Sequence, residues 1–201
     1  MKEISLTKGA IAIVDDEDFE RISEHSWALN SVGGYAVRKG SKNRGEPRTV
    51  QMHREILQAP VGIQIDHING NPLDNRKGNL RYADVQRNAF NRGKPTVRCS
   101  SIYKGVYKRK NKPNWKARIK YNDKHVELGT YVDEAYAAVV YNFAAAIFFG
   151  DFRRENAGEE LPEISESDKL SIFRKCHRAI QKHGWYVETE AYRSFFRKEV
   201  A

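Results

Sequence analysis

Cysteine is scarce in this sequence. The two cysteines, Cys99 and Cys176, lie far apart along a chain of 201 residues. Two isolated thiols build neither a framework of several disulfides nor a four-cysteine zinc site. The pattern therefore excludes the small disulfide-rich secreted proteins, and it fits a protein of the reducing cytoplasm.

Long uncharged apolar runs are also missing. The opening residues, MKEISLTKGA, lack the apolar core of a secretion signal. The longest apolar patch, at 135–150, is interrupted by Asn142 and is shorter than the about 18 apolar residues of a membrane span. We therefore expect this patch to be a buried helix, and we expect a cytoplasmic protein without a membrane partner.

Positive charge is present in excess and is concentrated in one part of the chain. The formal net charge is +9. Residues 99–132 hold nine Lys and Arg against two Asp and Glu, whereas residues 157–201 hold eight of each sign. Such clustering favours a face that binds a polyanion, and a solvated basic face without a partner is the alternative.

Hydrophobic alternation, turn residues and capping residues predict the order of elements in the first half of the chain. A hairpin with strands at 4–6 and 11–14 precedes a helix that Asp15 or Asp16 caps. Further elements are expected as follows: strands at 26–30, 34–39 and 48–52, a helix at 53–58, strands at 63–67 and 79–83, and a helix at 85–92 capped by Asp84.

An acid and a histidine, Asp66 and His67, end the predicted strand 63–67, and a polar loop rich in Asn and Gly follows them. Phosphodiester hydrolysis needs a base of near-neutral pKa and a divalent cation that neutralises phosphate charge. Mg²⁺ takes oxygen ligands and keeps several waters, so a carboxylate and one amide oxygen suffice. Asn88 and Asn91 share one face of the next helix and offer such an oxygen.

Asp66-His67, followed by NG, LDNR, NLR and QRNAFN, resembles the HNH motif of ββα-metal nucleases from phages and introns, and the likeness covers about residues 4–92. The resemblance implies the following roles: general base His67, metal ligands Asp66 and Asn88, histidine-orienting residue Asn79 and phosphate contact Arg92. Asn91 competes with Arg92 for the last role.

Purely structural roles remain the alternative for some of these polar residues. An Asp-His pair can simply bond loop backbone, and we expect Asp74 and Asn75 to pin the loop in this way. His53 is expected to be structural or a phosphate contact. Zinc is disfavoured, because the chain has no Cys pair and no pair of histidines at zinc-ligand spacing.

The basic middle segment alternates apolar and charged residues as β-strands do. Turn signals at NKPN and YNDK predict three antiparallel strands, and Asp133 is expected to cap a helix from about Glu134 to Phe149. Alternation places these basic residues on the outer face of the sheet: Lys108, Lys116, Arg118 and Lys120. The core face of the helix is predicted to comprise Ala135, Ala138, Val139, Phe143 and Ala146.

Residues 103–156, with YKGVYKR, WKARIKY, LGTY and the helix, resemble the ethylene-response-factor (Apetala-type) DNA-binding domain of plants. That resemblance implies a sheet lying in the DNA major groove with the helix packed behind it. The residues expected to contact DNA are Lys104, Lys108, Arg109, Trp115, Lys116, Arg118, Lys120 and Lys124.

The complete prediction is an α+β protein of three parts: a nuclease domain at 1–97, a DNA-binding domain at 98–157 and a helical tail at 158–201, with a linker at 93–101. We expect a homing-type endonuclease of a phage or intron that nicks duplex DNA with one Mg²⁺ or Mn²⁺ ion per active site. It would act as a monomer or weak homodimer in the cytoplasm of a bacterium or phage-infected cell. A non-enzymatic DNA-binding regulator is the alternative, and an RNA-binding module is disfavoured because no aromatic platform for unpaired bases is evident.

Overall fold

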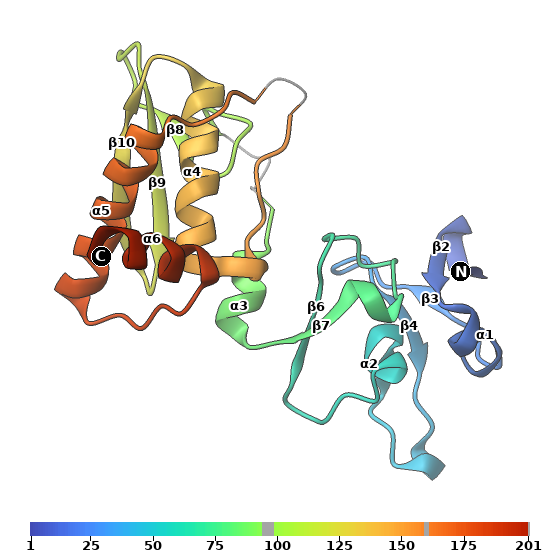
Figure 1. The fold of residues 1–201 in the computed structure, drawn as a ribbon. Helices are drawn as coiled ribbons and strands as arrows, with labels where there is room; N and C mark the ends of the chain where they lie inside the picture. Colours follow the sequence, from blue (N-terminus) through green and yellow to red (C-terminus); the bar gives the residue numbers. More distant parts are fainter. Residues whose placement is uncertain (94–98, 159–160, 201) are drawn as a thin grey trace. The chain divides into compact units, whose positions relative to one another are not determined.

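The computed structural model describes residues 1–93, 99–158 and 161–200, and it separates the chain into two compact units, Met1–Asn91 and Arg92–Ala201. Each unit combines helices with small antiparallel sheets, which confirms the α+β class (Figure 1). The expected domain boundary at residue 97, and most of the expected linker, lie outside the described residues.

The first unit contains the elements predicted for it, in the predicted order. The N-terminal hairpin and the following helix are β1 (Lys2–Ser5), β2 (Ile11–Val14) and α1 (Asp16–Ser23). A second antiparallel sheet comprises β3 (Ala28–Leu29), β4 (Ala36–Lys39) and β5 (Thr49–Gln51), and α2 (Met52–Ile56) follows it. The last elements are β6 (Gln64–His67), β7 (Leu80–Ala83) and α3 (Val85–Phe90), with 3-10 turns at Thr7–Gly9, Lys42–Arg44 and Lys77–Asn79.

One hydrophobic core supports the first unit. Trp27 is 3% exposed, and its indole N–H donates to the backbone carbonyl of Ile22 at 2.8 Å. Met52 is fully buried in the same cluster, and Ile65 of β6 and Leu80 of β7 also belong to it. The β6–β7 hairpin is therefore anchored to the core through one face of each strand.

The polar loop between β6 and β7 is tied to β2. The backbone N–H of Ile13 donates to the carbonyl of Leu73, and the N–H of Asn75 donates to the carbonyl of Ile13, both at 2.8 Å. Asp15 stands at the N-cap position of α1, but its carboxylate accepts the backbone N–H of Lys77 at 2.7 Å and caps no helix N–H. The N-terminal hairpin thus shapes a loop that lies about 60 residues further along the chain.

The second unit is a three-stranded antiparallel sheet with a long helix packed on it, as predicted. The strands are β8 (Val106–Lys108), β9 (Trp115–Tyr121) and β10 (Lys124–Tyr131), with β9 in the middle. The helices are α4 (Glu134–Phe149), the 3-10 turn Gly150–Phe152, α5 (Glu166–His183) and α6 (Glu190–Val200). The tail helices α5 and α6 pack against α4 (Figure 1).

Helix α4 is buried on more than one side. The carboxylate of Asp133 accepts the N–H of Tyr136 at 2.6 Å, which confirms the predicted cap. The predicted core face was mostly wrong, because only Ala138 among its five members is fully buried. Since α4 contacts the sheet as well as α5 and α6, no single stripe along the helix accounts for its burial.

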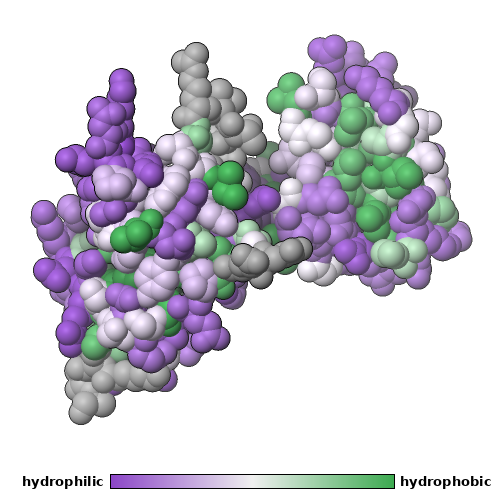
Figure 2. Space-filling model, turned by 90° about the horizontal axis from the view of Figure 1, so that it is seen from above, coloured by the Kyte–Doolittle hydropathy of each residue, from purple (hydrophilic) through white to green (hydrophobic). Residues whose placement is uncertain are grey.

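The apolar character of α4 follows from this packing. The segment Glu134–Phe152 is long and apolar enough to cross a membrane by length and composition, and 50% of it is buried inside the unit. Hydrophilic residues dominate the visible surface of the second unit, with scattered hydrophobic side chains among them (Figure 2). The sheet and the tail helices contact the segment and account for the part of it that is buried.

Candidate functional site

Asp66 and His67 occupy the last two positions of β6, and both are buried, with 5% and 6% of their surface exposed. Neighbouring residues of a strand point to opposite faces. Across the hairpin, Asp66 lies opposite Arg81 and His67 lies opposite Leu80. The carboxylate and the imidazole therefore enter different surroundings although the residues are adjacent in sequence.

Both oxygens of the Asp66 carboxylate accept hydrogen bonds. The Nε and Nη2 atoms of Arg81 donate to Oδ2 at 2.8 and 2.5 Å. The Nδ2 atom of Asn91 lies 3.0 Å from Oδ1. Sequence reasoning missed the Arg81 contact, because the pairing depends on the register of β6 against β7, and the polar loop leaves that register open.

The two helix asparagines take different positions beside β6. Asn91 is 6% exposed at the C-cap of α3, and its Nδ2 atom also lies 2.7 Å from the carbonyl oxygen of His67. Asn88 donates through Nδ2 to the side-chain oxygen of Gln64 at 3.0 Å. Gln64 and Asp66 share one face of β6, so Asn88 lies on the side of Asp66 but one step back along the strand.

The imidazole of His67 meets the polar loop. Its Nε2 atom lies 3.4 Å from Oδ1 of Asn75, whose Nδ2 donates to the carbonyl of Leu73 at 3.1 Å. Burial lowers the pKa of His67 below its ordinary value, against smaller opposing effects from Asn75 and two nearby carboxylates. The imidazole is therefore neutral at pH 7 and able to accept a proton.

Asn79 fixes the loop and makes no hydrogen bond to the imidazole that it was expected to orient. Its Nδ2 donates to the carbonyl of Asp74 at 2.8 Å and to Oδ1 of Asn69 at 3.0 Å. The Asp74 carboxylate accepts hydrogen bonds from the guanidinium of Arg76. Asn75 donates through its side chain to the loop carbonyl of Leu73 and through its backbone to the carbonyl of Ile13 in β2. Asp74 and Asn75 thus pin the loop, as predicted. Asn79 can act on His67 through the loop that carries Asn75.

A second buried histidine lies against the first. His53 is 5% exposed, its ring centroid is 5.0 Å from that of His67, and Tyr35 packs on both rings. Its Nδ1 atom is buried without a hydrogen-bond partner. Burial, followed by the neighbouring His67, lowers the pKa of His53 to about 3. His53 therefore stays neutral in the folded protein throughout the physiological range.

This depressed pKa predicts a pH-dependent stability of the first unit. The unfolded chain takes up a proton on His53 below about pH 6.5 and the folded chain does not, so stability is fully present above that pH and is lost as pH falls. Between pH 7 and pH 5 we expect His53 to account for about 2 kcal/mol of the loss in unfolding free energy. His53→Phe is expected to remove this share, while the share of His67 remains. Urea unfolding followed by the fluorescence of Trp27, with Trp115 and Trp185 replaced by Phe in both proteins, measures it; equal pH dependence of the two proteins would refute the assignment.

Arg92 and Lys104, predicted to contact DNA, both belong to the second unit. The Nζ atom of Lys104 donates to the backbone carbonyl of Arg92 at 2.8 Å. Burial, together with the nearby Arg154, lowers the pKa of Lys104 to about 8. The ammonium of Lys104 is therefore turned towards the protein, while the Arg92 residue is exposed.

The register of the second sheet decides which of the predicted basic residues face outward. Lys116 and Arg118 point away from the buried Ala117 of the same strand, as expected. Lys108 lies opposite Trp115, and its Nζ atom sits 4.9 Å from the centroid of that ring, so it shares the face of Ala117. Its predicted place on the outer face was wrong, because the first hairpin pairs Tyr107, not Lys108, with Lys116.

The outer face of the sheet combines positive charge with one acid. Its members are Tyr107, Lys116, Arg118, Lys120, His125, Glu127 and Thr130. The guanidinium of Arg118 lies 4.5 Å from the centroid of the Tyr107 ring, and the Tyr107 hydroxyl donates to Glu127 at 3.3 Å. Lys120 forms an exposed ion pair with Asp123 at 2.8 Å. Arg109 and Lys124 are exposed. Lys124 lies opposite Tyr121 and is therefore out of register with the outer-face residue His125.

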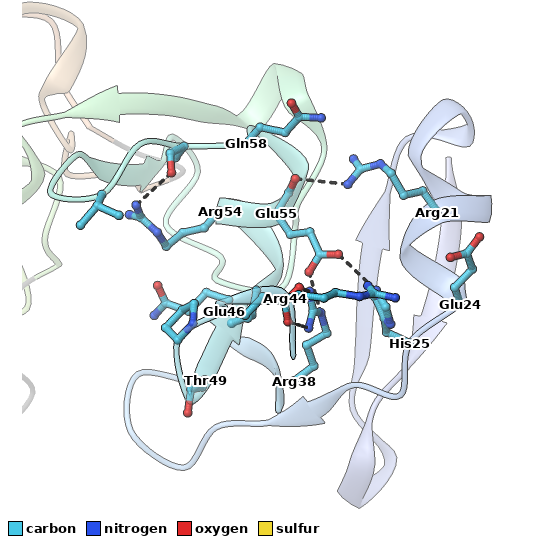
Figure 3. A pocket seen from close by; sticks show the side chains of 15 residues that line it. Arg21, Glu24, His25, Arg38, Arg44, Glu46, Thr49, Arg54, Glu55 and Gln58 are labelled. Atoms are coloured by element: carbon cyan, nitrogen blue, oxygen red, sulfur yellow. Dashed lines mark hydrogen bonds and ion pairs between the residues drawn. The ribbon is translucent and has the colours of Figure 1, made fainter. Parts of the chain in front are cut away.

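A cavity of about 500 Å³ also lies between α1, β4, β5 and α2 (Figure 3). Most of its charged side chains are partnered within the unit. Arg38 forms ion pairs with both Glu46 and Glu55 at 2.7 Å. Glu55 also lies 3.5 Å from His25. Arg54 donates to backbone carbonyls of the turn that follows α2. Most of these charges are thus used within the fold, and the residues that line the cavity do not include Asp66 or His67.

Comparisons with known proteins identify a family to which the region around β6, β7 and α3 is similar. Residues 58–90 match the family described as HNH endonuclease. Over 155 residues the chain is 34% identical to an uncharacterized HNH endonuclease of Acanthamoeba polyphaga mimivirus, which covers 74% of this chain and 76% of the viral protein. Over 60 residues it is 37% identical to Protein 3.8 of Escherichia phage T7, which covers 30% of this chain and 49% of the phage protein. The family match includes Asp66, His67, Asn79 and Asn88 and ends before Asn91.

Proposed function

The chain belongs to the HNH endonuclease family and is therefore a nuclease that acts on DNA, and we propose that it hydrolyses phosphodiester bonds of the duplex with one Mg²⁺ ion at Asp66 and His67 as general base. The observation that carries this proposal is the buried Asp66-His67 pair at the end of β6, where consecutive residues supply a carboxylate and a neutral imidazole on the two faces of the strand.

The donors around Asp66 suit a hard divalent cation. Members of this family generally depend on a divalent metal, and the side chains beside β6 offer a carboxylate and amide oxygens. Among the described residues, no group of three or more His, Cys, Asp or Glu could hold a metal ion. A site with so few protein ligands fits Mg²⁺ or Mn²⁺, which keep several waters. A divalent ion bound there would neutralise charge on the phosphate and on the departing 3′ oxygen.

The chain's own part in the reaction lies with His67. Because Oδ1 of Asn75 can only accept a hydrogen bond, its contact with Nε2 favours the tautomer that carries the proton on that nitrogen. Nδ1 is then the basic nitrogen and takes the proton of the attacking water. Asn79 serves this step by holding the loop that places Asn75.

The proposed activity is tested with supercoiled plasmid and the full-length protein. With Mg²⁺ we expect conversion to open circles, because one such site cuts one strand at each encounter, and with EDTA we expect no conversion. Binding that leaves the plasmid supercoiled in both tubes would contradict hydrolysis. Mapping of the cut ends on a DNA fragment tests the homing type of action, which requires one preferred site.

The second oxygen ligand is proposed to be Asn88, with Asn91 as a clamp on the end of β6. The amide nitrogen of Asn91 faces Asp66 and the carbonyl of His67, so its oxygen would reach an ion only after those hydrogen bonds were lost. For Asn88, the proposal requires a change of rotamer that breaks its hydrogen bond to Gln64.

Substitution by Asp separates these two roles. We expect Asn88→Asp to keep or tighten Mn²⁺ binding and Asn88→Ala to weaken it about 10-fold or more. Asn91→Asp places a negative charge against Asp66 and the His67 carbonyl, so we expect it to destabilise the first unit. Isothermal titration with Mn²⁺ and urea unfolding measure both effects, and the reverse pattern would make Asn91 the ligand.

The outer face of β8–β10 is proposed to dock the enzyme on duplex DNA. The support is its cluster of Lys116, Arg118 and Lys120 on a sheet of a size that fits the major groove, together with the resemblance to the plant domain. The similarity to the viral nuclease spans 155 residues, which exceeds the 91 residues of the first unit and so extends into this one.

A further inference from the structure

Arg81 holds the carboxylate that the proposed ion needs. Asp66 and Arg81 are direct cross-strand partners, and their side chains are 6% and 16% exposed. Two guanidinium nitrogens donate to the same oxygen, Oδ2, at 2.8 and 2.5 Å. Asn91 approaches the other oxygen. The negative charge of Asp66 is thus already neutralised within the protein.

An ion at Asp66 and this ion pair compete for the same carboxylate. A carboxylate oxygen has two lone-pair directions, and the two nitrogens of Arg81 use those of Oδ2. Mg²⁺ lies about 2.1 Å from its oxygen ligands, which would place it within a few ångströms of the guanidinium. Two cations so close repel strongly in a site shielded from water. An ion bound through Oδ1 would therefore weaken the hold of Arg81 on the carboxylate and favour its departure.

We propose that Arg81 is an exchangeable counter-cation, which neutralises Asp66 in the free enzyme and moves to a DNA phosphate when a divalent ion takes its place. The proposal rests on the proposed function, in which Asp66 binds the ion and the scissile phosphate lies beside it. A guanidinium pairs with phosphate as well as with carboxylate, so the exchange leaves both anions neutralised.

The exchange couples ion binding to DNA binding. Without DNA, an ion that displaces Arg81 breaks its two hydrogen bonds to Oδ2 in a partly buried site. With DNA, the phosphate receives the guanidinium and the displacement costs less. Linkage then requires that DNA tighten ion binding and that the ion tighten DNA binding by the same factor, which for coupled sites is commonly about 5- to 150-fold.

The test measures Mn²⁺ binding to the full-length protein by the electron paramagnetic resonance of free Mn²⁺. All proteins carry His67→Ala to prevent cleavage, and each is titrated with and without a mixed-sequence DNA duplex. A parallel titration of Asp66→Asn corrects for Mn²⁺ bound by the DNA itself. Arg81→Met, which keeps the length of the side chain and removes its charge, is expected to bind Mn²⁺ about 10-fold more tightly without DNA, and DNA is expected to tighten its Mn²⁺ binding less than it does in the protein that keeps Arg81.

Unchanged or weaker Mn²⁺ binding by Arg81→Met without DNA would overturn the exchange, as would equal tightening by DNA in both proteins. If the Met variant does not fold by circular dichroism, Arg81→Lys decides the question, because its single ammonium holds Oδ2 less firmly. We expect Arg81→Lys to bind Mn²⁺ without DNA more tightly than the protein that keeps Arg81. Equal affinities of the two proteins would overturn the proposal. If the Asp66→Asn variant and the protein that keeps Asp66 bind Mn²⁺ with equal affinity, the proposed metal site itself is refuted.

Discussion

Replacement of His67 by Ala is expected to lower the Mg²⁺-dependent nicking rate about 10³-fold and to leave DNA binding intact. A positioned general base contributes about 10² to 10⁴ to such a step, and no other described side chain adjoining Asp66 offers an imidazole at the strand end. His53 lies against His67, but its pKa of about 3 makes it too weak a base to substitute. Initial rates of plasmid relaxation and a gel-shift titration measure the two quantities.

His183→Ala provides the matched control for this experiment. His183 is an exposed histidine at the end of α5, so the same substitution there removes an imidazole without touching the site. We expect wild-type nicking from this variant. Comparable losses in both variants, or substantial residual nicking in His67→Ala, would remove His67 from the proposed role.

Removal of positive charge from the outer face of β9 is expected to weaken DNA binding about 100-fold at low salt. The triple variant Lys116→Gln, Arg118→Gln, Lys120→Gln deletes up to three phosphate contacts. Each lost contact lowers the slope of log affinity against log salt by about 0.9, so the full effect is a slope smaller by about 2.7. Fluorescence anisotropy with a duplex at several salt concentrations measures both quantities.

Two controls separate a docking surface from general charge. The variant Arg174→Gln, Arg178→Gln, Lys182→Gln removes the same charge from exposed positions of α5 and is expected to bind DNA nearly as the wild type does. Glu127→Gln removes the acid of the outer face and is expected to tighten non-specific binding. Equal losses from the two triple variants would show that only total charge matters.

Elements with local signals could be predicted from the sequence. The helix Glu134–Phe149 was predicted with both of its ends, because Asp133 supplies a cap, Gly150 ends the apolar run, and neither signal depends on distant residues. The placement of Asp66 and His67 at the end of a strand, before a loop, a second strand and a helix, was predicted for the same reason.

Features that depend on register and on packing could not be predicted. The loop between β6 and β7 does not specify which residue faces Asp66, so the Arg81 ion pair was invisible in the sequence. Likewise, the rotation of α3 about its axis decides whether Asn88 or Asn91 meets the carboxylate, and helical spacing places both on one side. Lys108 was assigned to the wrong face because the bend of the first hairpin shifts alternation by one residue.

The attachment of the β6–β7 loop to β2 bears on how this nuclease can be rebuilt or recombined. The 33 residues of the family match would lose Ile13 and Asp15, whose backbone and carboxylate hold the loop from outside. A graft of that segment alone into another scaffold would leave the loop unsupported and the imidazole unplaced. The smallest segment that can carry the site into another protein therefore begins at the N-terminal hairpin. In chimaeras with related enzymes, the junction between the two sequences should be placed after α3.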